Sequence, residues 1–203
     1  MQELEKFDQV REILGEANPM ARKKIYTHLN SSMQGFIASS PLVMVSTVDA
    51  DGFPTISPKG DEAGFVRITD EGRLLIPELR GNKLAFSLAN IVNKSKVALF
   101  FLVPGTSETL RVHGTCRLLS GDEISRSLAS KTQQALLAIE VQVASAYFHC
   151  GKALLRSHLW QPEHWPQAVH ISLGQQVADN LGESDEFAED LDKVIKNRYI
   201  TDF

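Results

Sequence analysis

Two runs of strand-forming residues, LVMVSTV at 42–48 and VALFFLV at 97–103, constrain the fold more than any other feature. Both are dominated by apolar, often β-branched or aromatic residues, which is typical of strands buried on both faces. The first run is followed by turn residues, Asp49–Gly52, and a returning segment at 53–57. Further strands are predicted at 64–68, 73–77, 110–118 and 139–148. Short turns favour antiparallel pairing, so the sequence predicts an α+β chain that is mainly β, with about six antiparallel strands in a barrel or sandwich.

Helical patterns precede and follow these strands. One covers 4–14 and stops at Gly15, and a second begins at Asn18-Pro19 and continues to about residue 37. The chain after Gly151 is predicted to be mostly helical. We therefore expect an N-terminal helical extension at 1–35, a barrel domain at 36–160, and a C-terminal helical extension at 161–203 packed on the same domain.

The composition limits the classes of function. The 203 residues carry a net charge of −4, so the chain as a whole does not attract nucleic acid or an anionic membrane. The N-terminus is charged, and no apolar run approaches the ~20 residues of a membrane span, so we expect a cytoplasmic protein. The glycine-rich dinucleotide fingerprint and the P-loop are both absent from the sequence.

The best candidate for anion binding is the segment Leu79–Lys83. A strand ends there, and a helix is predicted to begin, which would leave unpaired N–H groups at its first turn. Arg80 and Lys83 add two cations, and Asn82 adds a side-chain donor. A phosphate group suits such a place, although a solvated turn capped by Asn82 explains the same residues.

Two strand segments are further candidates. Pro58 and Gly60 in the segment Ser57–Asp61 predict a sheet edge where Lys59 could meet a ligand, or alternatively a β-bulge. If Leu110 points into the core, Thr109 and Arg111 share the opposite face. Arg111 would then either bind a phosphate or carbonyl group of a ligand, or pair with Glu108 or Glu140.

The segment from Phe148 to Lys152 contains His149 and Cys150, which as strand neighbours point to opposite faces and do not form a nucleophile pair. The two cysteines, Cys116 and Cys150, lack zinc-site spacing. No metal site is predicted from the histidines either, because none of them shows helix-face ligand spacing beside an acidic residue: His113, His149, His158, His164 and His170.

Four stretches in chain order resemble the pyridoxamine 5′-phosphate oxidase-like flavoproteins: FIASSPLVMVSTVDADGFPTISPKGD, LLIPELRGNKLAFSLANIVNKSKVALFFLVPG, ETLRVHGTCRLL and YFHCGKALLRSHLW. The resemblance covers Phe36 to Trp160 and implies an FMN-binding split barrel. It also implies a homodimer that holds FMN between its two copies. The FMN-binding positions that it implies are Ser57, Lys59, Gly60, Arg80, Asn82, Lys83, Thr109 and Arg111, with Lys152 and Trp160 approaching from the second subunit.

Two departures argue against oxidation of vitamin B6. The family's arginine-rich stretch after the second strand is replaced by Ser57-Pro58-Lys59, and the Arg-x-His motif near the C-terminus is missing. We therefore expect an FMN-dependent oxidoreductase acting on an unidentified small molecule, with no catalytic acid or base assigned. Two alternatives stay open: a non-catalytic flavin-binding or sensing protein, and a haem-binding split barrel that uses a histidine such as His149.

Overall fold

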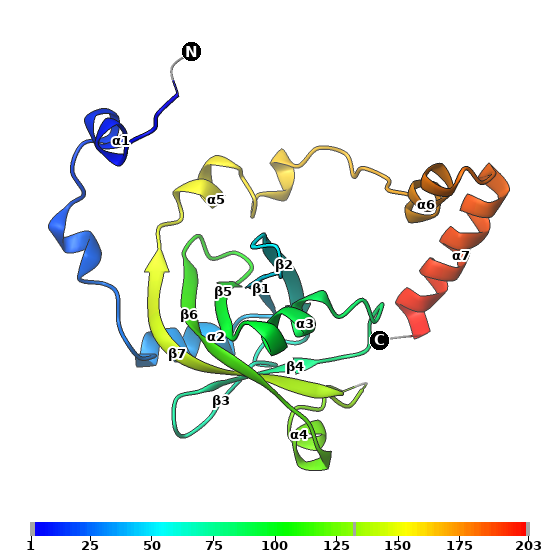
Figure 1. Ribbon diagram of the computed structural model, residues 1–203, viewed down its shortest axis with the longest axis horizontal. Helices are drawn as coiled ribbons and strands as arrows, with labels where there is room; N and C mark the ends of the chain where they lie inside the picture. Colours follow the sequence, from blue (N-terminus) through cyan, green and yellow to red (C-terminus); the bar gives the residue numbers. More distant parts are fainter. Residues whose placement is uncertain (1–2, 132, 202–203) are drawn as a thin grey trace.

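One antiparallel sheet dominates the structure, a computed structural model that describes residues 3–131 and 133–201. Within these residues seven strands pair in the order β2-β1-β5-β6-β7-β4-β3, and the sheet curls into a half-barrel (Figure 1). The strands are β1 (Leu42–Val48), β2 (Pro54–Gly60), β3 (Arg67–Ile68), β4 (Leu74–Glu78), β5 (Lys96–Leu102), β6 (Thr109–Leu119) and β7 (Leu137–His149). The predicted class, a mainly β split barrel with flanking helices, is confirmed, with seven strands in place of about six.

The concave side of the sheet holds the hydrophobic core. Alternate residues of β1, β5, β6 and β7 point inward, because side chains along a strand alternate between faces. Helix α2 (Ser31–Ala38) adds Met33 and Ile37 to this core. The largest fully buried side chains include Phe101, Leu74, Ile76, Leu99 and Leu110.

The outer face of β1 and β5 is only half-buried. Val43, Val45 and Thr47 of β1 are buried, whereas the alternating residues between them keep part of their surface exposed. Strand β5 repeats the pattern. The prediction that both faces of these two strands are buried is therefore confirmed for the inner face and wrong for the outer face.

The N-terminal region differs from the continuous helix predicted from Asn18 to residue 37. Helix α1 (Phe7–Leu14) ends before Gly15, as predicted, but Asn18 caps only a short 3₁₀ helix, η1 (Pro19–Arg22). The backbone then extends, and Tyr26 pairs with Ala146 of β7 before Asn30 caps α2. Two separate asparagine caps and a backbone bridge thus divide the apolar pattern into two helices.

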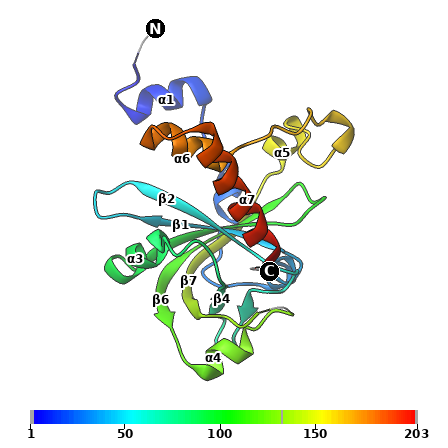
Figure 2. The same cartoon turned by 90° about the vertical axis from the view of Figure 1, so that its right-hand side faces the viewer.

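The remaining helices are α3 (Phe86–Asn93), α4 (Asp122–Ser127), α5 (Lys152–Arg156), η2 (Pro162–His164), α6 (Leu173–Leu181) and α7 (Asp185–Thr201). Helices α6 and α7 pack on each other and stand apart from the sheet, on the opposite side from α1 (Figure 1; Figure 2 gives the perpendicular view). Among the described residues, no helix is long and apolar enough to cross a membrane. The domain boundaries predicted from the sequence stay predictions, and their outermost residues, 1–2 and 202–203, lie outside the described part.

Candidate functional site

An ion pair bridges the open side of the half-barrel. Lys59 belongs to the edge strand β2 and Glu78 to β4, five places away in the strand order, yet Lys59 Nζ lies 2.5 Å from Glu78 Oε2. The curl of the sheet makes this contact possible. The two side chains are only 13% and 20% exposed. The position of Lys59 on an edge strand, which its neighbours Pro58 and Gly60 predict, is confirmed.

A groove of about 660 Å³ opens beside this ion pair. Its lining comes from β2, from the end of β4, from the loop after β4 and from the first half of α3. The groove brings together two segments that the sequence singled out separately, since it is lined by Ser57, Lys59, Asn82 and Lys83. Gly60 lies next to this lining, at the end of β2, where its backbone approaches Pro41 so closely that an added Cβ would lie 3.1 Å from the Pro41 carbonyl oxygen.

The helix predicted to start at Arg80–Lys83 begins later, at Phe86. Lys83 and Ala85 have φ angles of 61° and 55°, in the left-handed region, so the chain turns twice before it becomes helical. Asn82 caps the loop, because its Oδ1 accepts the Leu84 N–H at 3.1 Å. Within the described part of the chain no side chain caps α3 itself, and its first residues, Phe86 and Ser87, line the groove. The first turn of α3 therefore lies at the groove, and its N–H groups have no side-chain acceptor among the described residues.

Asn90 holds α3 against the β1–β2 hairpin. Its Nδ2 donates hydrogen bonds to Thr47 Oγ1 at 3.0 Å and to Thr55 Oγ1 at 3.1 Å, and the two hydroxyl oxygens lie 2.8 Å apart. Asn90 and Thr47 are buried. This network ties the middle of α3 to β1 and β2, and two of its members, Thr55 and Asn90, also line the groove.

Arg80 lies outside this groove. It lines a neighbouring hollow of about 510 Å³ together with Asp122 and Ser125 of α4, and its backbone N–H donates to Gln133 Oε1 at 3.1 Å. The structure thus separates Arg80 from Lys83, although the sequence places them three residues apart.

Thr109 and Arg111 lie on the other face of the sheet from Ser57 and Lys59. Strand register places Arg111 opposite Phe100, Phe100 opposite Met44, and Met44 opposite Pro58, so these four side chains share the outer face. Arg111 follows neither of its predicted surface pairings. Its guanidinium carbon lies over the Phe100 ring, 5.7 Å from the centroid.

Lys152 and Trp160 lie beyond the far end of β7. Trp160 Nε1 donates to the Thr106 carbonyl oxygen at 2.9 Å, which fixes the indole against the β5–β6 turn. Lys152 is exposed at the first position of α5. Neither residue lines the groove within one copy of the chain.

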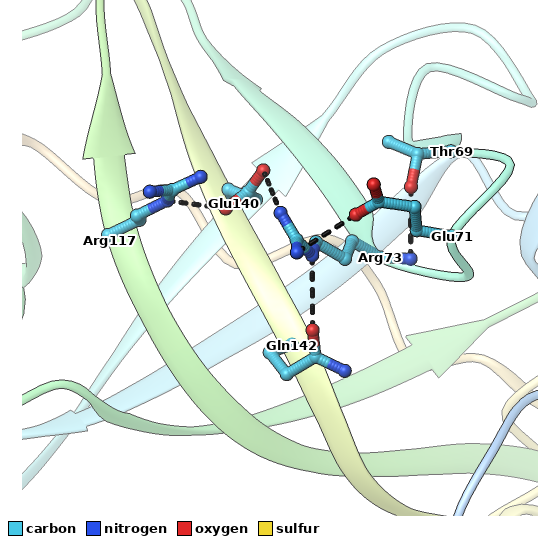
Figure 3. Close-up of polar contacts among 6 residues, drawn as sticks. All are labelled: Thr69, Glu71, Arg73, Arg117, Glu140 and Gln142. Carbon is cyan, nitrogen blue, oxygen red and sulfur yellow. Dashed lines mark hydrogen bonds and ion pairs between the residues drawn. The ribbon is translucent and has the colours of Figure 1, made fainter.

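Glu140 pairs with two other arginines (Figure 3). Arg117 Nε lies 2.5 Å from Glu140 Oε2, and Arg73 Nη1 lies 3.4 Å from Glu140 Oε1. Arg73 also donates to Gln142 and pairs with Glu71. The hydrogen bond from Arg117, reinforced by the charges of both arginines, holds the pKa of Glu140 below its ordinary value. This cluster joins β6, β7 and the residue before β4. Arg111 lies opposite Tyr147 in the strand register, seven residues along β7 from Glu140, and is therefore too far away to pair with it.

Sequence reasoning missed Glu78 and Asn90. Glu78 follows the strand predicted at 73–77, and a carboxylate after an apolar segment says nothing about a lysine 19 residues earlier. Asn90 interrupts the apolar face of a helix, and a buried polar residue at such a position needs a partner. The sequence could therefore have indicated that Asn90 has a hydrogen-bond partner, although it could not identify Thr47 and Thr55 as the partners.

The cysteines and histidines form no reactive centre among the described residues. No group of three or more His, Cys, Asp or Glu side chains in that part of the chain is placed to hold a metal ion. Cys116 is buried, and burial raises the pKa of its thiol to about 11, so the thiol stays protonated at neutral pH. Cys150 is exposed.

Comparison with known proteins places residues 29–150 in a family whose sequence profile is described as "Pyridoxamine 5′-phosphate oxidase". No curated protein matches the chain. Similar solved structures include HupZ of Group A Streptococcus, which is 20% identical, with a TM-score of 0.48 over 59% of this chain and 93% of that one.

Two further solved structures have lower sequence identity to this chain and lower TM-scores. A Clostridium acetobutylicum protein related to general stress protein 26 is 14% identical, with a TM-score of 0.45 over 59% of this chain and 86% of that one. A pyridoxamine 5′-phosphate oxidase-related, FMN-binding protein of Nostoc punctiforme is 17% identical, with a TM-score of 0.36 over 49% and 51%. The family assignment rests on the sequence match over residues 29–150.

Proposed function

Because this chain belongs to the pyridoxamine 5′-phosphate oxidase family, we propose that its groove binds FMN and that the protein is an FMN-dependent oxidoreductase acting on a small molecule. One observation carries the proposal. The start of α3, which no side chain caps, opens into the groove together with Asn82 and Lys83. Free N–H groups and a cation at a helix start suit the phosphate of a mononucleotide.

The groove also suits the rest of an FMN molecule. Its volume of about 660 Å³ lies within the range of about 300–1,000 Å³ usual for ligand pockets. Apolar side chains from the loop before α3, from α3 itself and from the start of β7 line it beside the polar groups, and three of them are exposed or half-buried: Leu84, Phe86 and Leu137. Apolar walls with a few polar groups are the surroundings that a planar aromatic ring requires.

FMN supplies hydride or electron transfer when it is bound, and the chain supplies binding and orientation. Lys83 would neutralise the phosphate, and the apolar wall would pack against the ring. Asn90 keeps α3 in place through Thr47 and Thr55. No described residue of the groove is assigned as a catalytic acid or base.

We also propose that the functional unit is a homodimer with FMN at the interface. The groove of one copy is open to solvent, and the exposed apolar residues at its rim include Ile56, Leu84 and Phe86. A second copy laid over this rim would bury them. The measurement is the mass of the protein in solution, and a monomer at micromolar concentration with FMN bound contradicts the dimer.

The test of FMN binding is a titration of the purified protein with FMN and, separately, with riboflavin. A charge-assisted hydrogen bond contributes about 1.5–3 kcal/mol, so Lys83→Ala is expected to weaken FMN binding about 10- to 150-fold. Riboflavin, which lacks the phosphate, should lose little affinity. Lys193→Ala is the matched control, because this lysine pairs with Asp190 on α7, outside the groove.

The outcome separates the candidate functions. Bound FMN with turnover of a reduced nicotinamide supports the oxidoreductase, and bound FMN without turnover supports a binding or sensing protein. A protein that binds neither flavin contradicts the proposal, and a Soret band after addition of haem would then favour the haem-binding alternative.

A further inference from the structure

The groove contains a carboxylate, whose negative charge would repel a phosphate dianion. A site that binds only a phosphate would therefore not be expected to include this carboxylate. Glu78 lines the groove together with Lys59, and their charged atoms are in contact. Both side chains are largely shielded from solvent, so a phosphate placed on Lys59 would also face the negative charge of Glu78 at close range.

If a phosphate replaced Glu78 as the partner of Lys59, the binding free energy would include a large unfavourable contribution. Lys59 would have to leave its partner, and Glu78 would remain as an uncompensated charge in a largely buried position. Lys83 offers an alternative with no such penalty, because among the described residues its ammonium is paired with no carboxylate. The phosphate therefore belongs at Lys83 and the start of α3, and Lys59 needs another role.

An ammonium beside a carboxylate presents one hydrogen-bond donor and one acceptor, side by side and with no net charge. The pyrimidine edge of the isoalloxazine ring has the complementary pattern, with carbonyl oxygens flanking the N3–H group. This edge is neutral in the oxidised flavin, so binding it leaves the ion pair intact. Each charged group keeps its partner and gains one further hydrogen bond.

We propose that Lys59 and Glu78 stay paired in the holoprotein and together bind the pyrimidine edge of the flavin ring. Lys59 donates to a ring carbonyl, and Glu78 accepts the N3–H. The proposal rests on the proposed function, because it assigns a role in binding the same cofactor. It gives Lys59, one of the FMN-binding positions that the family resemblance implies, a role away from the phosphate, and it adds Glu78, which the sequence did not indicate.

The test compares three ligands that share a ring: FMN, riboflavin and 3-methylriboflavin, whose N3 carries no hydrogen. The main variant is the double substitution Lys59→Met/Glu78→Leu, since replacing both members of a buried pair leaves no unpaired charge. Far-UV circular dichroism and thermal unfolding check that this variant folds as the wild type does. The matched control is Lys83→Ala, which lies in the same groove.

We expect the double variant to bind FMN and riboflavin more weakly by the same factor, about tenfold or more, because the ring is common to both. Wild-type protein should prefer riboflavin to 3-methylriboflavin, and the double variant should lose that preference. Lys83→Ala should weaken FMN binding while leaving riboflavin and the N3-methyl preference unchanged.

A different result overturns the inference without touching the proposed function. If the double variant binds riboflavin normally but no longer prefers FMN, then Lys59 is a phosphate ligand. If Glu78→Gln tightens FMN binding, then Glu78 competes with the phosphate for Lys59. Failure of the wild type to bind any of the three flavins would overturn the proposed function as well.

Discussion

Asn90 offers the clearest test of how the structure builds the groove. Its side chain is buried and donates two hydrogen bonds to the hydroxyl groups of Thr47 and Thr55. A hydrogen bond between neutral groups contributes a net 0.5–1.5 kcal/mol, so losing two costs about 1–3 kcal/mol. The hydroxyls keep each other as partners at 2.8 Å, which places the expected loss for Asn90→Ala near the middle of that range, about 2 kcal/mol.

The assay is urea unfolding followed by far-UV circular dichroism. With a slope of about 2 kcal/mol per molar urea, the midpoint should fall by about 1 M. Asn93→Ala is the matched control, because Asn93 lies on the same helix and its amide donates to the exposed Ala89 carbonyl of the preceding turn, so the midpoint should hardly change. Equal midpoints for the two variants would refute the idea that Asn90 fixes α3. In the same samples, Asn90→Ala should also bind FMN more weakly than Asn93→Ala.

Two further substitutions test the sheet. Glu140→Gln should lower the free energy of unfolding at pH 7 by about 1 kcal/mol, since its partners Arg73 and Arg117 are partly exposed. The pKa of Glu140 is lower in the folded protein than its usual value near 4.5. The difference in free energy of unfolding between Glu140→Gln and wild type should therefore persist above pH 4.5 and vanish as the pH falls through the folded pKa. Urea unfolding at several pH values measures this difference. Gly114→Ala would place a Cβ 2.3 Å from the Gln142 carbonyl oxygen and should cost about 3 kcal/mol or more, whereas Gly35→Ala, in open space on α2, should be neutral or stabilising in thermal unfolding.

Strands could be predicted from the sequence because their signal is local. The alternation at 110–118, for example, sets the inward face of β6 without reference to any other strand. The position of Lys59 on an edge strand followed from Pro58 and Gly60, which disfavour a central strand. These features depend on backbone chemistry within a few residues.

Helix boundaries and the partners of charged residues could not be predicted in the same way. An apolar spacing of three and four from Ile25 to Ile37 is compatible with one helix, but a backbone bridge from Tyr26 to β7 prevents it. The start of α3 moved to Phe86 because two residues adopt left-handed conformations that neither lysine nor alanine favours on its own. The pairing of Lys59 with Glu78 depends on the curl of the whole sheet, which no local pattern encodes.

The placement of Arg111 has a consequence for the oligomeric state. Arg111 lies three strands from Pro58 in the sheet, about 14 Å away, and on the outer face, whereas Lys59 points to the inner face. One flavin cannot contact both residues of a single copy, so a binding role for Arg111 requires the groove of a second copy. Lys83→Ala and Arg111→Ala should then each weaken FMN binding alone, while mixed dimers of the two variants regain one intact site per dimer. A titration of the mixture that shows no tight site would mean that Arg111 takes no part in binding the cofactor.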